Sequence, residues 1–229
     1  MQTDLTIEQS KRDLQLILSK FSHEIRNPVA LISSELQLMA SDHPEVCRYR
    51  QWDCLMDSLD YVKELLNALS DYNHAGNIHP VSVNPCEFLK TVLSCEKPVL
   101  DYLGITLETH IPTLTFPVSL DRVKMRQVLF NLLRNARESI EHPHGKIIVS
   151  LAQVHGGISI SVRDNGCGIT KEQSEHIFSP FVTYKSNGTG LGLCICREIT
   201  QAHGGSLSFQ SRPGHGSVFS VFLPADICR

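Results

Sequence analysis

An apolar residue recurs at every seventh position near the start of the chain, in the row Leu18, Ile25, Ile32 and Met39. This spacing places the four side chains on one face of a helix, so it predicts a helix over residues 12–40 with a packing seam. A turn signal follows at residues 41–44. Apolar steps of three and four then predict a second helix, whose apolar residues are Trp52, Leu55, Leu59, Val62, Leu66 and Leu69. The two helices form a hairpin.

A single two-helix hairpin buries too little apolar surface to be stable, so we expect its stripes to pack against a second copy. The expected state is a homodimer held by a four-helix bundle. Residues 73–77 interrupt the helical pattern and indicate a linker. We therefore expect two domains: a dimerisation and phosphotransfer hairpin over residues 1–76 and a second domain over residues 77–229.

The second domain has an α+β pattern. Helices are expected near 85–102, 120–141 and 191–203, and strands near 105–109, 146–154, 157–162, 206–211 and 217–223. His155 and Gly156 separate two of these strands and indicate a hairpin turn. The fold class is α+β, with a helical hairpin followed by a layered α/β domain.

Composition excludes several classes of protein. The formal net charge of −3 provides no basic field for nucleic acid. The sequence also lacks a run of about 20 apolar residues, which is the length needed to span a bilayer. The eight cysteines are scattered, which favours reduced thiols and a cytoplasmic location. We expect no membrane contact by this segment, although a sensory or membrane region upstream is compatible with the pattern.

His23 falls at the sixth position of the seven-residue repeat, the farthest from the seam, so its imidazole is expected to face solvent. A solvent-facing histidine is mostly neutral and nucleophilic at pH 7. Glu24 can accept the Nδ1 proton and so make Nε2 more nucleophilic. Pro28 removes a helix hydrogen bond nearby and is expected to loosen the helix. A histidine without these neighbours would be an idle surface residue.

The segment Phe21–Pro28 (FSHEIRNP) resembles the H-box of sensor histidine kinases. The resemblance implies three roles. His23 is the phosphoacceptor, Glu24 is its acid/base helper, and Asn27 positions water when a phosphorylated partner is dephosphorylated.

Three further segments carry nucleotide chemistry. Asn131 and Asn135 lie four residues apart on one helix face, and amide oxygens suit Mg²⁺ bound together with phosphates. Asp164 begins a glycine-containing turn (DNGCGI) whose carboxylate can accept a hydrogen bond from an adenine amine, although such a string alone is also a common turn. Residues 186–193 (SNGTGLGL) place three glycines before an apolar helix, which favours an anion at the helix start. The P-loop lysine is missing, so this is not a Walker A motif.

In this order, the three segments resemble the N, G1 and G2 boxes of the ATP-binding domain shared by histidine kinases, Hsp90, type II topoisomerases and MutL, the Bergerat or GHKL fold. Residues 178–181 are similar to the F-box, and residues 214–217 to the closing glycine turn. The resemblance implies ATP and Mg²⁺ as ligands. It implies that Asn135 binds the metal with Asn131 nearby, that Asp164 binds adenine, and that Gly166 and Gly168 shape the base pocket. It also implies triphosphate contacts from Gly188, Thr189, Gly190, Leu191 and Gly192.

One departure concerns phosphate binding. Many relatives carry a basic or aromatic residue three or four places after the second asparagine, where this chain has Glu138 and Ser139. The phosphate contact is then expected from Lys185 or Arg134. Lys185 can equally be a solvated loop charge.

The resemblance implies a sensor histidine kinase core. It would phosphorylate His23 from ATP, pass the phosphoryl group to an aspartate of a response regulator receiver domain, and also dephosphorylate that regulator. Two alternatives keep part of the pattern: a GHKL ATPase or serine kinase, against which the H-box argues, and a non-catalytic phosphotransfer scaffold, against which the intact glycines and asparagines argue.

Overall fold

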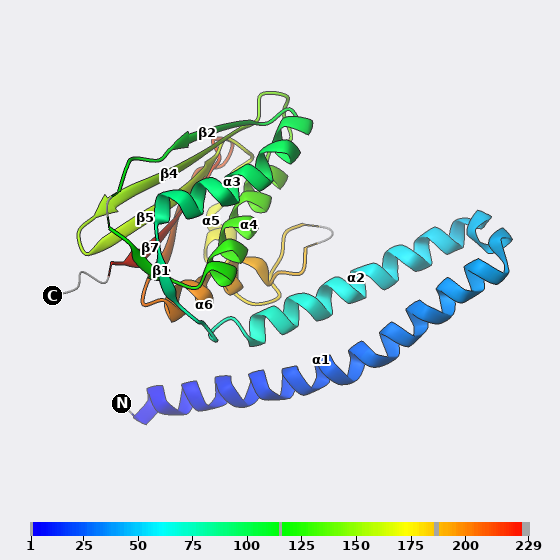
Figure 1. The fold of residues 1–229 in the computed structure, drawn as a ribbon. Helices are drawn as coiled ribbons and strands as arrows, with labels where there is room; N and C mark the ends of the chain where they lie inside the picture. The colour runs from blue at the N-terminus through cyan, green and yellow to red at the C-terminus, as the bar shows by residue number, and fades with distance from the viewer. Residues whose placement is uncertain (1, 115, 186–187, 226–229) are drawn as a thin grey trace. The chain divides into compact units, whose positions relative to one another are not determined.

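The computed structural model describes residues 2–114, 116–185 and 188–225, with the backbone alone for residues 2–17, 19–21 and 23. The chain divides into two compact units. One comprises residues 1–74 and 183–191, and the other comprises residues 75–182 and 192–229. The positions of the parts relative to one another are not determined (Figure 1), so each unit stands as a separate body.

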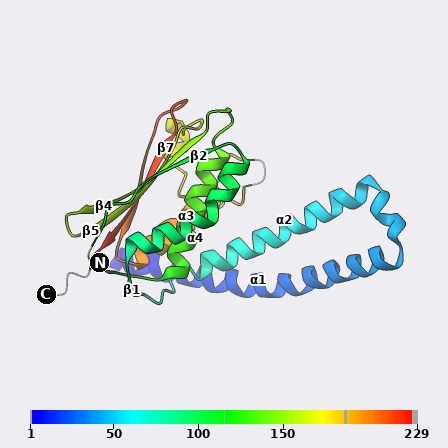
Figure 2. The same ribbon diagram turned by 45° about the horizontal axis from the view of Figure 1, so that its top comes forward.

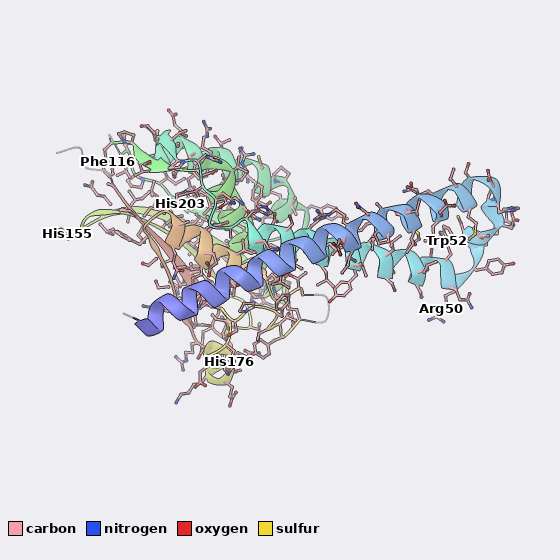
Figure 3. All side chains as sticks on the ribbon, turned by 90° about the horizontal axis from the view of Figure 1, so that it is seen from below. Arg50, Trp52, Phe116, His155, His176 and His203 are labelled. Atoms are coloured by element: carbon pink, nitrogen blue, oxygen red, sulfur yellow. The ribbon has the colours of Figure 1, made fainter. Side chains whose placement is uncertain are left out.

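The first unit is built on a helical hairpin. Helix α1 (Gln2–Asp42) and helix α2 (Arg50–Asn73) run antiparallel and are joined by the 3₁₀ helix η1 (Pro44–Arg48), as Figure 1 shows. Both predicted helices are confirmed, and α1 begins ten residues earlier than expected. Figure 3 shows Arg50 and Trp52 at the turn end of this hairpin.

The two helices do not meet through the predicted seam. A buried cluster of Val29, Leu59 and Leu66, with Leu36 and Val62 packed against it, joins α1 to α2. Ile32, from the seven-residue row, is 50% exposed in the single chain. The reason is that α1 has two apolar rows, and the hairpin covers only the one that contains Val29.

A five-stranded sheet forms the centre of the second unit. Its order is β2-β4-β5-β7-β6, with β2 parallel to β4 and every other pair antiparallel. The strands are β2 (Thr106–His110), β4 (Lys146–Val154), β5 (Gly157–Asp164), β6 (Ser206–Ser211) and β7 (Ser217–Pro224). Two further short strands, β1 (Val81–Val83) and β3 (Val118–Leu120), pair with each other.

Helices cover one face of the sheet. Figures 1 and 2 show α3 (Pro85–Tyr102), α4 (Arg122–Glu138) and α6 (Gly192–Ala202) on the same side of it. Along β7, buried residues alternate with half-buried ones, because only the helix-facing side of the sheet is fully covered. This arrangement confirms the α+β class.

Several predicted features have clear outcomes. The expected helices and the five sheet strands are confirmed, with β5 extending to Asp164, whereas β1, β3, η1 and the short helix α5 (Lys171–Ser174) were not predicted. None of the seven cysteines that the structure describes forms a disulfide, and Cys194 and Cys196 are buried. Among the described residues, no helix combines the length and apolar character needed to traverse a bilayer.

Candidate functional site: a nucleotide pocket and a phosphoacceptor helix

Helix α4 carries the two asparagines. Its buried side packs through Met125, Val128, Leu129, Leu132, Leu133 and Ala136. Asn131 and Asn135 are half-buried and lie one turn apart, as the sequence predicted. Their amide oxygens fit Mg²⁺, which prefers oxygen ligands and is commonly shared with substrate phosphates.

Asp121 fixes the start of α4. Its Oδ1 accepts hydrogen bonds from the backbone N–H groups of Val123 and Lys124 at 2.9 and 3.0 Å, and its Oδ2 accepts from the N–H of His79 at 2.8 Å. The Asp121 N–H donates to Nε2 of His203 at 2.9 Å, and Nδ1 of His203 lies 2.7 Å from the Ile199 carbonyl. The proton of a neutral His203 is therefore on Nδ1. Figure 3 shows His203 beside α6, so this residue joins the start of α4 to the end of α6.

Asp164 is the last residue of β5 and is 4% exposed. Its Oδ1 accepts three hydrogen bonds: from the N–H of Gly166 at 2.9 Å, the hydroxyl of Ser139 at 3.1 Å and the N–H of Ser217 at 3.2 Å. Oδ2 takes none of these three. Oδ1 thus holds the carboxylate in position, and Oδ2 is the oxygen suited to accept a hydrogen bond from an adenine amine.

Burial raises the pKa of Asp164 above its usual value of 3.8, and the hydrogen bonds from Gly166, Ser139 and Ser217 oppose the rise. Burial penalises the charged form, whereas N–H and O–H donors favour it. Asp164 is therefore a carboxylate whose ionisation has a free-energy cost in the folded chain.

The glycines of the G1 segment are needed by the fold itself. A Cβ on Gly166 would lie 2.1 Å from the Ser139 hydroxyl. Gly168 has φ +72°, and a Cβ there would lie 2.2 Å from the Arg212 carbonyl. These close approaches pack the turn against the end of α4 and against the turn before β7, which holds Asp164 in place.

Gly192 at the start of α6 differs from those glycines. The nearest atoms to a Cβ there would be Nη2 of Arg134 at 3.7 Å and the side chain of Asn131 at 3.9 Å, which is ordinary van der Waals contact. Arg134 and Asn131 therefore lie beside the first residue of α6. Burial raises the pKa of the Cys196 thiol to about 12, opposed by a hydrogen bond with Asn131 and by the charge of Arg134, which agrees with this placement.

The F-box segment is anchored by aromatic contacts. The ring of Phe178 packs edge-on to Phe209 with 5.7 Å between centroids, and the Arg197 guanidinium lies 5.5 Å from the Phe178 centroid. Phe181 is 55% exposed and has φ +64°, the left-handed region that bulky residues rarely adopt. The two phenylalanines of this segment thus differ: one is packed and the other is exposed.

Residues 183–191, which precede α6 in the sequence, belong to the first unit. Within this stretch the Leu191 N–H donates to the Thr189 hydroxyl at 3.3 Å, and the Gly188 N–H donates to the Lys185 carbonyl at 3.3 Å. Gly190 has φ +68°, and Lys185 is exposed. Ser186 and Asn187 lie outside the described residues.

The H-box lies on α1. The Ser22 hydroxyl donates to the Leu18 carbonyl at 2.7 Å, and Nη2 of Arg26 donates across the hairpin to the Leu66 carbonyl at 3.3 Å. Glu24 and Asn27 are exposed. The His23 side chain lies outside the described residues, so its outward orientation stays a prediction. The helix is continuous through Pro28.

The second unit brings Asn131, Asn135, Asp164, Gly166, Gly168 and Gly192 together, whereas His23, Glu24, Asn27, Lys185 and Gly188–Leu191 belong to the first unit. Sequence reasoning missed the contacts of Ser139 and Ser217 with Asp164, although Ser139 was noted as a departure from relatives. It also missed Asn165, whose Oδ1 accepts from the Lys146 N–H at 2.8 Å and whose Nδ2 donates to the His144 carbonyl at 2.9 Å. These bonds hold the loop after α4 against the G1 segment.

Comparison with known proteins identifies the class. Residues 120–227 match the family described as histidine kinase-, DNA gyrase B-, and HSP90-like ATPases. The catalytic domain of the histidine kinase ThkA is similar in structure, with 33% identity and a TM-score of 0.59 over 65% of this chain and 97% of that domain. The chain belongs to the GHKL-type histidine kinase catalytic cores, and this membership supports ATP as its ligand.

Individual relatives extend the match into the hairpin. The chain is 27% identical to the signal transduction histidine-protein kinase AtoS of Escherichia coli K12, over 91% of this chain and 34% of AtoS. It is 30% identical to the sensory histidine kinase/phosphatase NtrB of Azospirillum brasilense, over 96% of this chain and 58% of NtrB. ThkA in complex with the response regulator protein TrrA is 26% identical with a TM-score of 0.67, over 98% of this chain and 67% of that one. The chain thus spans about a third of AtoS and just over half of NtrB.

Proposed function

We propose that this chain is a sensor histidine kinase core that transfers the γ-phosphoryl group of ATP to its own His23. One observation carries the proposal: the H-box lies on a helix of a hairpin in the same chain as a histidine kinase-like ATPase fold. An ATPase or serine kinase of the same fold would have no need of this segment. A scaffold without catalysis would have no need of Asn131, Asn135 and the buried Asp164.

In the proposed reaction, Nε2 of His23 attacks the γ-phosphorus, the bond from that phosphorus to the bridging oxygen breaks, and ADP leaves. Glu24 accepts the Nδ1 proton and thereby orients the ring. Asp164 holds adenine through Oδ2. Mg²⁺, held through Asn135, would neutralise charge on the phosphates. His23 belongs to the first unit, whereas Asn135 and Asp164 belong to the second, so the reaction requires the imidazole and the γ-phosphate to be brought to bonding distance.

The acceptor of the phosphoryl group is proposed to be an aspartate of a receiver domain. Its carboxylate oxygen would attack phosphorus while the bond to Nε2 breaks. Two relatives support this step, since NtrB is named a kinase/phosphatase and ThkA forms a complex with a response regulator. Asn27 is exposed one turn after His23, and we assign it the role of orienting the water that hydrolyses the aspartyl phosphate of the regulator. We further propose a cytoplasmic homodimer joined through the hairpins.

The test is incubation of the whole chain with γ-³²P-labelled ATP and Mg²⁺. Wild type is expected to take up label that is labile in acid and stable in base, as a phosphorus–nitrogen bond requires. His23→Ala is expected to take up none. His43→Ala is the matched control and should label normally, because His43 is an exposed histidine at the hairpin turn that pairs with Glu45 at 3.2 Å.

The rival functions give different results. ADP release without label on either protein would indicate an ATPase. Label that is stable in acid and retained by His23→Ala would indicate a serine or threonine kinase. Either result would contradict the proposal.

A further inference from the structure

Arg134 lies between the two asparagines of α4 and beside the start of α6. Its Nη2 is 3.7 Å from the position of a Cβ on Gly192, and the Asn131 side chain is 3.9 Å from that position. These residues belong to the same unit. A guanidinium, an amide side chain and the first residue of an 11-residue helix therefore converge.

The adenine end of the proposed nucleotide site lies farther along the same helix. Ser139, which donates to Asp164, follows Asn131 by eight residues, or roughly 12 Å of helix rise. Asn135 lies between the two ends. A nucleotide whose base meets Asp164 and which runs along α4 past Asn135 would bring its phosphates toward Arg134.

We propose that Arg134 is a phosphate-binding residue of this site and makes it selective for nucleoside triphosphates over nucleosides. The inference rests on the proposed nucleotide function and names the cation that the sequence left open between Lys185 and Arg134. A guanidinium presents a fork of N–H donors that matches two phosphate oxygens at once. The N-terminal end of α6 adds a favourable field for the same anion.

The contact between Arg134 and Glu138 explains why the guanidinium can be recruited. Nε of Arg134 is 3.9 Å from Oε1 of Glu138, beyond hydrogen-bond distance, and both side chains are about half exposed. An exposed ion pair of this kind contributes little to stability, so Arg134 can leave Glu138 and bind a phosphate at little cost in free energy. Glu138 is also a negative charge near the expected phosphate position, and it should oppose ATP binding.

The experiment measures the affinities of the whole chain for ATP and adenosine by NMR titration, which quantifies millimolar as well as micromolar dissociation constants. Arg134→Gln is expected to weaken ATP binding about tenfold or more and to leave adenosine binding unchanged. Arg134→Lys should recover part of the loss, because an ammonium keeps the charge without the fork. Glu138→Gln should strengthen ATP binding.

Arg126→Gln is the matched control: it makes the same charge change on an exposed residue of α4, two turns before Arg134, and should leave both affinities unchanged. The inference is wrong if Arg134→Gln binds ATP as wild type does, or if ATP and adenosine weaken equally, since the latter marks a structural role. If wild type itself binds neither ligand, the nucleotide function fails as well.

Discussion

Asp164 shows how a single side chain combines structural and binding roles. The residue is almost fully buried, yet three donors converge on one of its oxygens. A carboxylate held in this way accepts a ligand N–H in a fixed direction. The three hydrogen bonds offset part of the free-energy cost of burying its charge, and a bound ligand N–H would offset more of it.

We predict that Asp164→Asn folds and loses adenine recognition. The amide oxygen can still accept from Gly166, Ser139 and Ser217, but its NH₂ group then faces the adenine amine, donor against donor. ATP affinity should fall about tenfold or more, measured by calorimetric titration. Thermal stability at pH 7 should be unchanged or higher because the buried charge is gone. A variant that binds ATP normally would show that Asp164 does not contact the base.

The raised pKa of Asp164 also sets the sign of a pH effect. Between the usual value of 3.8 and the raised value, the folded chain holds a proton that the unfolded chain releases. This residue's contribution to stability therefore falls as pH rises through that window. Asp164→Asn should lack this component, which comparison of unfolding midpoints from pH 4 upward would reveal.

The sequence identified Asp164 and the two asparagines as site residues. Asp164 comes just after a predicted strand, and the asparagines share one face of a predicted helix. Ser139 and Ser217 could not be assigned in the same way. They lie 25 and 53 positions from Asp164 and meet it only through the packing of α4 and β7. Likewise, periodicity identified the apolar row of α1 that contains Ile32, but not the row containing Val29 that α2 covers.

At the scale of elements, helix α4 depends on the cap at Asp121. Burial by itself would raise the pKa of Asp121, but the N–H donors of His79, Lys124 and Val123 outweigh it and lower the pKa below 3.8. The ionised carboxylate therefore stabilises the fold. Its contribution is complete above pH 3.8 and is lost as pH falls through the lowered pKa.

We predict that Asp121→Ala lowers the free energy of unfolding of the second unit by about 2 kcal/mol, because it removes the helix cap and the acceptor for His79. Asp121→Asn should cost less, since its amide oxygen still accepts from Val123 and Lys124. Urea unfolding followed by the NMR signals of sheet residues measures both. The difference in free energy of unfolding between wild type and Asp121→Asn should become smaller below pH 3.8. A difference that does not change with pH would contradict the assigned role of the charge.

Element length explains which elements the sequence revealed. Strands β4 and β7 have nine and eight residues, long enough for alternation to appear. Strands β1 and β3 have three residues each, and α3 and β2 lie between them in the sequence. Neither strand is therefore long enough, or close enough to its partner in the chain, to show a strand or hairpin pattern. Helix α5 has four residues, fewer than the pattern of an amphipathic helix requires.

At the scale of the whole molecule, the hairpin retains an apolar surface after α1 and α2 have packed. Five exposed residues of α1 form it: Ile25, Leu31, Ile32, Leu38 and Met39. A hollow lined by Met39, Val46, Tyr49, Gln51, Trp52 and Leu55 lies at the turn end of the hairpin. Monomeric soluble proteins in general seldom expose a contiguous apolar patch, and the proposed second hairpin would cover this one.

We predict that Ile32→Glu separates the dimer, because a carboxylate cannot be buried in an apolar four-helix core without a large desolvation cost. Light scattering after size exclusion should give twice 25.6 kDa for wild type and 25.6 kDa for the variant. Ser34→Glu adds the same charge to an exposed polar position two residues away and should remain dimeric. Circular dichroism must show equal helix content in both variants. A monomeric wild type would refute the dimer, and a dimeric Ile32→Glu would place the interface on another face of the hairpin.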